Sequence, residues 1–330
     1  MSPRGAVSRV PAALWVLLAA AASAAALWLL RGVPGLEAPR DWLQAHFGFL
    51  EQPAGFGISE GWLDFDSGHS YARAFATGVT NTLRAAVPAA LLAVALGTML
   101  GIGRLAPHLL VRAVCTAYVE TLRNVPLLVQ LLMLYFALTH LLPDADAPLR
   151  IGPDVWLDKG GLAMPWPMWD GGWWPTGLDR PERTAFGVAG GAALSPEYLA
   201  ITLGLGLYSA AFVAEIVRAG IQSVSAGQKL AAQALGMRGG QQLRLVVLPQ
   251  ALRLIVPALT NQLLSLTKNS SLAVAVGYPE VVSVANTSLN ATGRAFECLA
   301  IVMAVYLLLS LLTSAAMGIY NARVALRGWQ

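Results

Sequence analysis

The sequence has few charged residues. Only 12% of its 330 residues are Asp, Glu, Lys or Arg, while 56% are hydrophobic, and the mean hydropathy is +0.58. Soluble domains carry about 25% charged residues. Roughly half that share, with the apolar residues gathered in long runs, excludes an ordinary soluble globular protein and predicts a polytopic membrane protein.

Cysteine and histidine are also scarce. Cys115 and Cys298, the two cysteines, form neither a metal-binding spacing nor a disulfide framework. The four histidines are scattered, and no HExxH motif, nucleophile motif or GxxxxGK phosphate loop accompanies them. We therefore expect no metal site, no cofactor and no enzymatic activity. Any ATP hydrolysis that serves this chain must come from a separate chain.

Six hydrophobic segments have roughly the 20 apolar residues that a spanning helix needs. They occupy residues 12–30, 83–103, 113–142, 196–217, 255–276 and 296–319. The first resembles a signal peptide, because Arg4 and Arg9 precede it and Ala22-Ser23-Ala24 imitates a cleavage site. Its apolar run continues through Leu30, longer than a usual signal core, so we interpret it as an uncleaved helix. The sequence thus predicts an all-α membrane protein with about six spans.

Basic and acidic residues are distributed unevenly among the connecting segments. Arginine and lysine collect near both termini, at 104–112 and at 218–253, whereas most acids lie in 31–82 and 143–195. The positive-inside rule then places both termini and the 218–253 segment in the cytoplasm. The net charge of +4 reflects this bias, so we expect contact with membrane lipid and no nucleic-acid partner.

The chain divides into an N-terminal anchor with an external segment (1–82), a transmembrane domain (83–320) and a cytoplasmic tail (321–330). The domain carries an external insert at 143–195 and a cytoplasmic loop at about 219–252. The insert holds five of the ten tryptophans, and its Pro and Gly content argues against a regular domain. These tryptophans either anchor the insert in the interfacial aromatic belt or form a landing surface for an external partner.

The cytoplasmic stretch 224–252 contains no acidic residue. Small and apolar residues recur in it at fixed spacings: Ala231, Ala232, Gly236, Val246, Leu248 and Pro249. This pattern resembles the EAA signature of ABC importer permeases, E-A-A-x3-G-x9-I-x-L-P, through which a membrane subunit receives motion from a separate ATPase. Leu230 stands at the position of the signature glutamate. A glutamate there would favour a helix N-terminus and pair with a basic group, whereas leucine offers only apolar contact.

The residues of this loop predict two short helices that meet at a turn. The first covers 228–235 and ends at Gly236, which supplies a left-handed C-cap. Gly239 and Gly240 make a second break, and a helix resumes over 241–248 until Pro249 interrupts it.

Two further stretches extend the resemblance. YVETLRNVPLLVQ at 118–130 looks like the E-x2-R-x2-P-x-L-x-Q stretch of polar-amino-acid ABC permeases, and 261–280 looks like their L-T-K-N-S-S-L segment. Three more runs are similar to general L-amino-acid permeases: 51–59, 71–83 and 158–165. The resemblance implies a type I ABC importer permease in a bacterial inner membrane. Its implied partners are an ATPase, a second permease in a heterodimer and a periplasmic binding protein.

Charged residues inside spans are costly in lipid and usually functional. Glu120, Arg123 and Gln130 lie in the third segment, which Pro126 interrupts. Glu120 and Arg123 either form a simple i,i+3 ion pair, or Arg123 meets a substrate carboxylate. By the same i,i+3 spacing we expect an ion pair between Glu215 and Arg218.

A second polar break falls in the fifth segment, at Lys268, Asn269, Ser270 and Ser271. These side chains either join helices by hydrogen bonds or bind the carboxylate and amino groups of a substrate. The alternative to an ATP-driven importer is a secondary transporter or channel subunit. It would keep both polar breaks but would have no use for the 224–252 loop.

Overall fold

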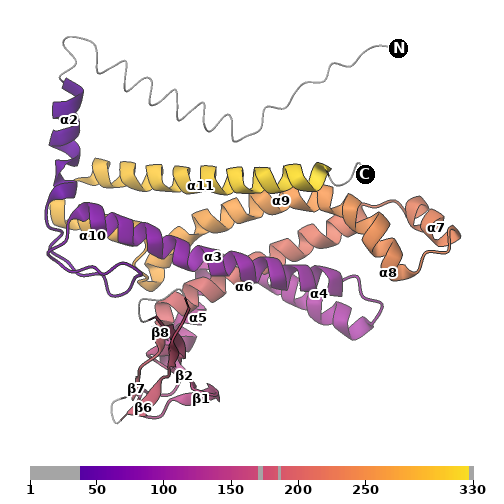
Figure 1. Cartoon of the computed structure of the whole chain (residues 1–330), viewed down its shortest axis with the longest axis horizontal. Coiled ribbons are helices and arrows are strands. Elements are labelled where there is room, and N and C mark those ends of the chain that lie inside the picture. The colour runs from indigo at the N-terminus through magenta and orange to yellow at the C-terminus, as the bar shows by residue number, and fades with distance from the viewer. Residues whose placement is uncertain (1–37, 170–173, 185–186, 327–330) are drawn as a thin grey trace.

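Four long helices lie side by side along the long axis of the molecule (Figure 1). The computed structural model describes residues 38–169, 174–184 and 187–326. The long helices are α3 (Tyr71–Gly103), α6 (Pro196–Gln222), α9 (Leu248–Asn269) and α11 (Ala295–Leu326). Each belongs to a helical stretch that is long and apolar enough to cross a membrane, as the sequence predicted.

Two further helices pass the same length and hydropathy test only when they are taken together. Helices α4 (Leu109–Asn124) and α5 (Leu127–His140) meet at an angle of 105°. Pro126 lies at the break, where it has no backbone N–H to continue the helical ladder. The predicted interruption at Pro126 is therefore confirmed. The first predicted span, 12–30, lies outside the described residues.

Shorter elements occupy the two ends of the bundle. One end carries α7 (Ala226–Ala234), α8 (Gly239–Gln242) and the π-helical turn η2 (Leu243–Val247). The opposite end carries α2 (Ala38–Phe47), η1 (Gly48–Glu51), η3 (Ser270–Val276) and α10 (Val281–Thr292). Helix α3 begins at Tyr71, so the position between 82 and 83 that the sequence suggested as a domain boundary lies inside this helix.

Helices α3 and α6 approach closely because glycines line their contact. A Cβ on Gly97 would lie 2.5 Å from Val213 Cβ, and one on Gly101 would lie 2.7 Å from the Ala214 carbonyl oxygen. Small residues allow this approach in lipid, where packing rather than the hydrophobic effect holds helices together. The contact fixes α3 and α6 as one unit; α9 packs against α6, and α11 packs against α9.

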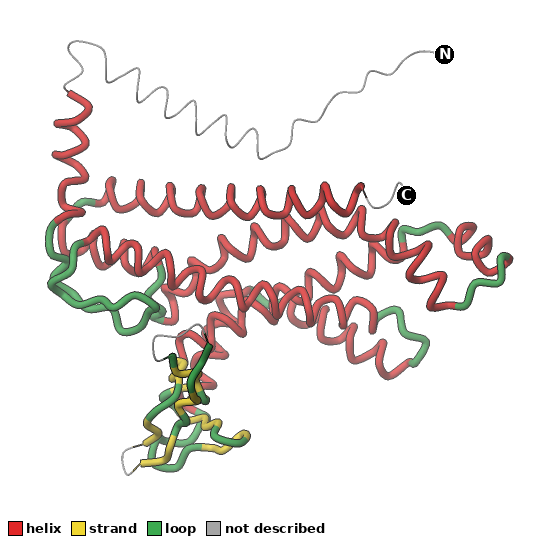
Figure 2. The backbone as a smooth tube through the Cα atoms, viewed as in Figure 1, coloured by secondary structure: helices red, strands yellow, loops and turns green. Residues whose placement is uncertain are grey.

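The 143–195 insert is more regular than its Pro and Gly content predicted. Its described residues form eight short strands, β1 (Leu149–Gly152), β2 (Val155–Asp158), β3 (Gly161–Met164), β4 (Trp166–Met168), β5 (Gly177–Asp179), β6 (Glu182–Thr184), β7 (Gly187–Ala189) and β8 (Ala192–Leu194). Strands β1-β2-β3-β8 make one antiparallel sheet, while β4-β5 and β6-β7 pair separately. Figure 2 shows this strand module projecting from the helical bundle. The expectation that Pro and Gly exclude a regular domain was wrong, because the strands are very short and accommodate residues such as Gly161, Pro167 and Gly187.

Candidate functional site

The 224–252 loop begins with a short helix that ends in a Schellman turn. Ser225 caps α7 by accepting a hydrogen bond from the Gln228 amide at 3.4 Å. At the other end Gly236 has φ +73°, and the Met237 amide donates to the Ala232 carbonyl at 3.1 Å. This 6→1 bond defines the motif. The left-handed cap predicted at Gly236 is confirmed.

The second half of the loop differs from the prediction. Gly239 and Gly240 begin α8 rather than breaking a helix. Pro249 lies at the start of α9, within one helical stretch that runs through α8 and η2 to Val276. The wider π-helical turn just before Pro249 makes room for its ring, which would clash with a carbonyl in a regular α-helix. The Gln250 side chain donates a hydrogen bond to the Val246 carbonyl at 2.9 Å, which gives this carbonyl of the π-helical turn a partner.

The predicted coupling residues divide into a surface set and an internal set. Leu230 is 63% exposed and Leu248 is 40% exposed, and the neighbouring Leu235 is 78% exposed. Ala232, by contrast, is 3% exposed and lies inside the loop. Large apolar side chains are thus presented at one end of the bundle, while Ala232 and Gly236 shape the turn that presents them.

Gln130 stabilises the break between α4 and α5. Its side-chain amide nitrogen donates to the carbonyls of Leu122 and Val125, both at 2.8 Å. These carbonyls lie at the C-terminal end of α4, where the helix leaves them without backbone donors. The proline and glutamine of the 118–130 motif therefore act together: Pro126 breaks the helix and Gln130 satisfies the carbonyl groups that the break leaves free.

Glu215 on α6 contacts three arginines: one on α4, one on α6 itself and one that directly follows α3. Arg104, which follows α3, donates from Nη1 to Glu215 Oε2 at 2.5 Å, and Arg218 contacts both carboxylate oxygens. Arg123 Nη1 of α4 lies 3.9 Å from Glu215 Oε2. The predicted Glu215–Arg218 pair is confirmed. In the described part of the chain, the ion pair of Arg123 is with Glu215 and not with Glu120.

The polar break in the fifth segment coincides with a change of helix type. Helix α9 ends at Asn269, and the 3-10 helix η3 begins at Ser270. The Ser270 hydroxyl donates to the Thr267 carbonyl at 2.7 Å and the Ser271 hydroxyl donates to the Lys268 carbonyl at 2.9 Å. Lys268 itself is exposed. The serines thus complete the local helix, and the ammonium group is left at the surface of an apolar helix.

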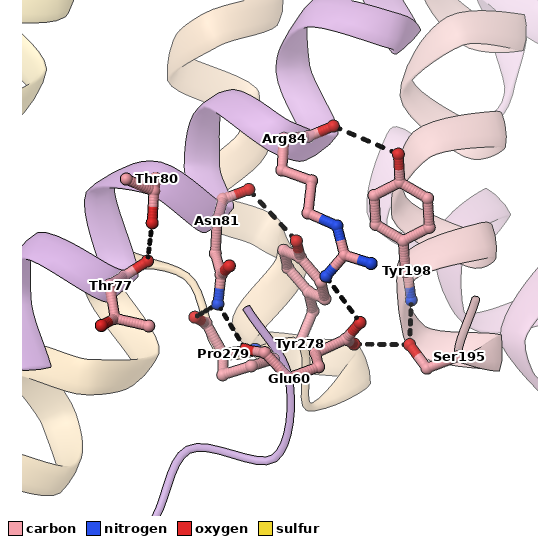
Figure 3. A network of polar contacts seen from close by, with 9 residues as sticks. All are labelled: Glu60, Thr77, Thr80, Asn81, Arg84, Ser195, Tyr198, Tyr278 and Pro279. Atoms are coloured by element: carbon pink, nitrogen blue, oxygen red, sulfur yellow. Dashed lines mark hydrogen bonds and ion pairs between the residues drawn. The ribbon is translucent and has the colours of Figure 1, made fainter. Parts of the chain in front are cut away.

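Figure 3 shows a polar network that the sequence reasoning missed. Glu60 Oε2 lies 3.1 Å from Arg84 Nη1, and the Ser195 hydroxyl donates to Glu60 Oε1 at 2.5 Å. The Asn81 amide donates to the backbone carbonyls of Glu60 and Pro279, both at 2.9 Å. The network joins the segment before α3 to α3, α6 and the loop before α10. Arg84 could have pointed to this network, because it is a charged residue inside a predicted span. The neighbouring sequence, however, does not indicate which distant residues it contacts.

Glu280 caps α10 from a buried position between the spans. It is 1% exposed, accepts a hydrogen bond from the Ser283 amide at 3.0 Å, and accepts another from the Tyr306 hydroxyl at 3.1 Å. Burial disfavours the charged carboxylate and raises the pKa of Glu280 to about 7. No sequence pattern marked this residue as unusual.

The long apolar helices and the exposed apolar loop at one end of the bundle define a multi-pass membrane protein with a surface outside its spans. The family described as "Binding-protein-dependent transport system inner membrane component" matches residues 93–326, and the chain belongs to that family. It is therefore a multi-pass inner-membrane permease subunit and not an enzyme, with ATP hydrolysis in a separate subunit. Membership also implies a substrate-binding protein and a second permease as partners.

Two curated relatives cover most of the chain. The chain is 37% identical to the general L-amino acid transport system permease protein AapQ of Rhizobium johnstonii, over 85% of this chain and 84% of that protein. It is 38% identical to the putative amino-acid ABC transporter permease protein YhdX of Escherichia coli, over 85% of each. A solved amino acid ABC transporter with histidines is similar at a TM-score of 0.57 and 27% identity, covering 77% of this chain and 95% of that one. The predicted ABC permease fold is confirmed.

Proposed function

We propose that this permease forms the translocation path of an ATP-driven amino-acid importer, with both termini in the cytoplasm and a different permease as its partner in a heterodimer. The amino-acid cargo is supported by the names of the two relatives, each similar over 85% of this chain. The orientation is supported by the arginine bias of the segments that join the spans.

The α7–α8 surface receives the motion of the ATPase. The observation that carries this assignment is a pair of large leucines, Leu230 and Leu235, exposed at 63% and 78% on a short helix outside the spans. Lipid does not cover a cytoplasmic loop, so a protein partner is the natural cover for such a patch. The proposed coupling residues are Leu230, Ala231, Ala232, Gly236, Val246, Leu248 and Pro249.

The two polar breaks line the substrate path. The proposed path residues are Glu120, Arg123, Gln130, Lys268, Asn269, Ser270 and Ser271. A charged group that faces lipid inside the bilayer is costly, so we place Lys268 and Arg123 toward water or protein instead. Within this set, Gln130 fixes the geometry of the path by binding two backbone carbonyls. The charged groups contact the transported amino acid.

Reconstitution in liposomes tests the proposed function. Uptake of labelled L-amino acids by the complete complex should require ATP, the ATPase and the binding protein together. Uptake by the two permeases alone would identify a secondary transporter and overturn the proposal. Lys268→Met should reduce uptake while the complex still assembles. Lys159→Met is the control, because Lys159 pairs with Asp144 in the external insert.

A further inference from the structure

The three arginines around Glu215 hold it unequally. Arg104 lies 2.5 Å from the carboxylate and Arg218 contacts both of its oxygens, whereas Arg123 approaches only to 3.9 Å. If Arg123 moved away, Glu215 would keep its two close partners and its charge would stay compensated. The contact between Arg123 and Glu215 is therefore the one that this cluster can exchange at least cost.

Arg123 is also the most accessible member of the cluster. Its side chain is 41% exposed, against 12% for Arg104 and 28% for Arg218. The guanidinium carbon lies 5.3 Å from the centre of the Phe212 ring, which supports the cation without using its N–H donors. A guanidinium group binds a carboxylate through two parallel hydrogen bonds, and the long contact to Glu215 leaves that geometry available.

The position of Arg123 fits a role in the path. It stands in the last turn of α4, immediately before the break at Pro126. Breaks of this kind are tolerated in a membrane where backbone lines a cavity or is covered by protein.

We propose that Glu215 is a resident counter-ion that holds Arg123 when the path is empty, and that the carboxylate of a transported amino acid replaces Glu215 on Arg123. This deepens the proposed function and rests on it. The cluster of three arginines and one glutamate carries a formal charge of +2 (3 − 1), which one carboxylate lowers to +1. The site recognises the α-carboxylate that all amino acids share, so an amine without a carboxylate does not bind there.

Direct binding measurements on the purified complex in nanodiscs test the exchange. The probe is a labelled mixture of L-amino acids, added without binding protein and competed with L-alanine or with ethylamine, which lacks the carboxylate. Arg123→Gln should weaken binding at least about tenfold, the loss of a charge-assisted contact. Glu215→Gln should strengthen amino-acid binding about two- to fivefold. This substitution removes the competing carboxylate, whose interaction with Arg123 is worth about as much as an exposed ion pair. L-alanine should compete and ethylamine should not.

Opposite effects of the two substitutions are the signature of exchange. If both variants weaken binding, the pair is structural and the proposal fails; unchanged binding in Arg123→Gln also refutes it. Glu215→Asp keeps the charge beside Arg104 and Arg218 but shortens the reach to Arg123, so it should also tighten binding if Glu215→Gln does not assemble. Arg112→Gln, an equal charge change on the same helix, is the control.

ATPase stimulation by loaded binding protein is measured in parallel. Its absence from the unmodified complex would refute the proposed function, whereas normal stimulation with unchanged Arg123→Gln binding would refute only the exchange.

Discussion

Replacing Gly236 with valine isolates the contribution of one backbone conformation to coupling. Gly236 has φ +73°, and a Cβ built on it meets no atom within 4 Å. The substitution therefore creates no clash, and its cost lies in the backbone alone. An L-residue in the left-handed region is penalised by about 1–2 kcal/mol, and a β-branched residue such as valine lies at or beyond the upper end of this range.

The loop has little other stabilisation to offset that cost. Helix α7 has nine residues, and helices this short are marginal in water without packing. Its attachments within the chain include the buried Ala232 and a hydrogen bond from the Gln242 side chain to the Lys229 carbonyl at 3.1 Å. A penalty of about 2 kcal/mol corresponds to roughly a 30-fold loss of the ordered turn. We expect coupled ATPase activity to fall at least about tenfold.

The assay is ATPase activity of the complex in nanodiscs, stimulated by loaded binding protein. Gly239→Val is the matched control, since Gly239 also has open space around its Cβ position but no positive φ. Gly236→Asn should retain most of the activity, because asparagine tolerates the left-handed conformation. Full stimulation in Gly236→Val, or an equal loss in Gly239→Val, would refute the assignment of this turn to coupling.

Three further predictions address the break, the buried acid and the orientation. Gln130→Leu should destabilise the purified permease by about 1–3 kcal/mol, because two carbonyls at the break lose their donor; an unchanged thermal midpoint would contradict this. The pKa of Glu280 is raised in the folded protein to about 7, from 4.5 in the unfolded chain. Between these two pH values the folded protein keeps a proton that the unfolded chain has lost. The protonated carboxyl therefore stabilises the fold fully below pH 4.5, and this contribution is lost as the pH rises to about 7. Thermal stability should thus fall from about pH 5.5 to about pH 8 by roughly 2 kcal/mol more than in Glu280→Gln, and parallel pH curves would oppose it. A cysteine placed at Ala163 should react with an impermeant reagent in intact cells, and one at Gly240 only after permeabilisation; the reverse pattern would invert the topology.

Local chemistry made the spans and the turn predictable from sequence. Hydrophobic length locates helices in a membrane because each must satisfy its own backbone, and Gly236 could be assigned because few residues adopt positive φ. Pro126 was predictable for the same kind of reason. The effect of Pro249 was not, because a proline near a helix start can be absorbed by a π-helical turn, and that choice depends on what the following helix packs against.

Partners distant in sequence were the main failure. Arg123 has an acid three residues away, Glu120, and spacing offered that pair as one of two alternatives. The structure instead brings Arg123 to Glu215 on another helix, and Glu60 to Arg84 and Ser195. Which of several charges meet inside a bundle depends on helix rotation and crossing, and these follow from the close packing of small residues rather than from any local pattern.

The second half of the coupling loop and the second polar break lie on one continuous helical rod. The helical stretch from Gly239 to Val276 has 38 residues, about 57 Å at 1.5 Å per residue. It includes α8 at one end and the change to η3 after Asn269 at the other. Closely packed helices shift as units between discrete arrangements rather than deforming continuously, so a displacement of α8 by a partner moves the far end as well. Pro257 and the π-helical turn at η2 are the points where this rod can bend. This helix therefore joins α8 directly to the Lys268–Ser271 break, and the leucines of α7 reach it only through the contacts of α7 with α8 and η2.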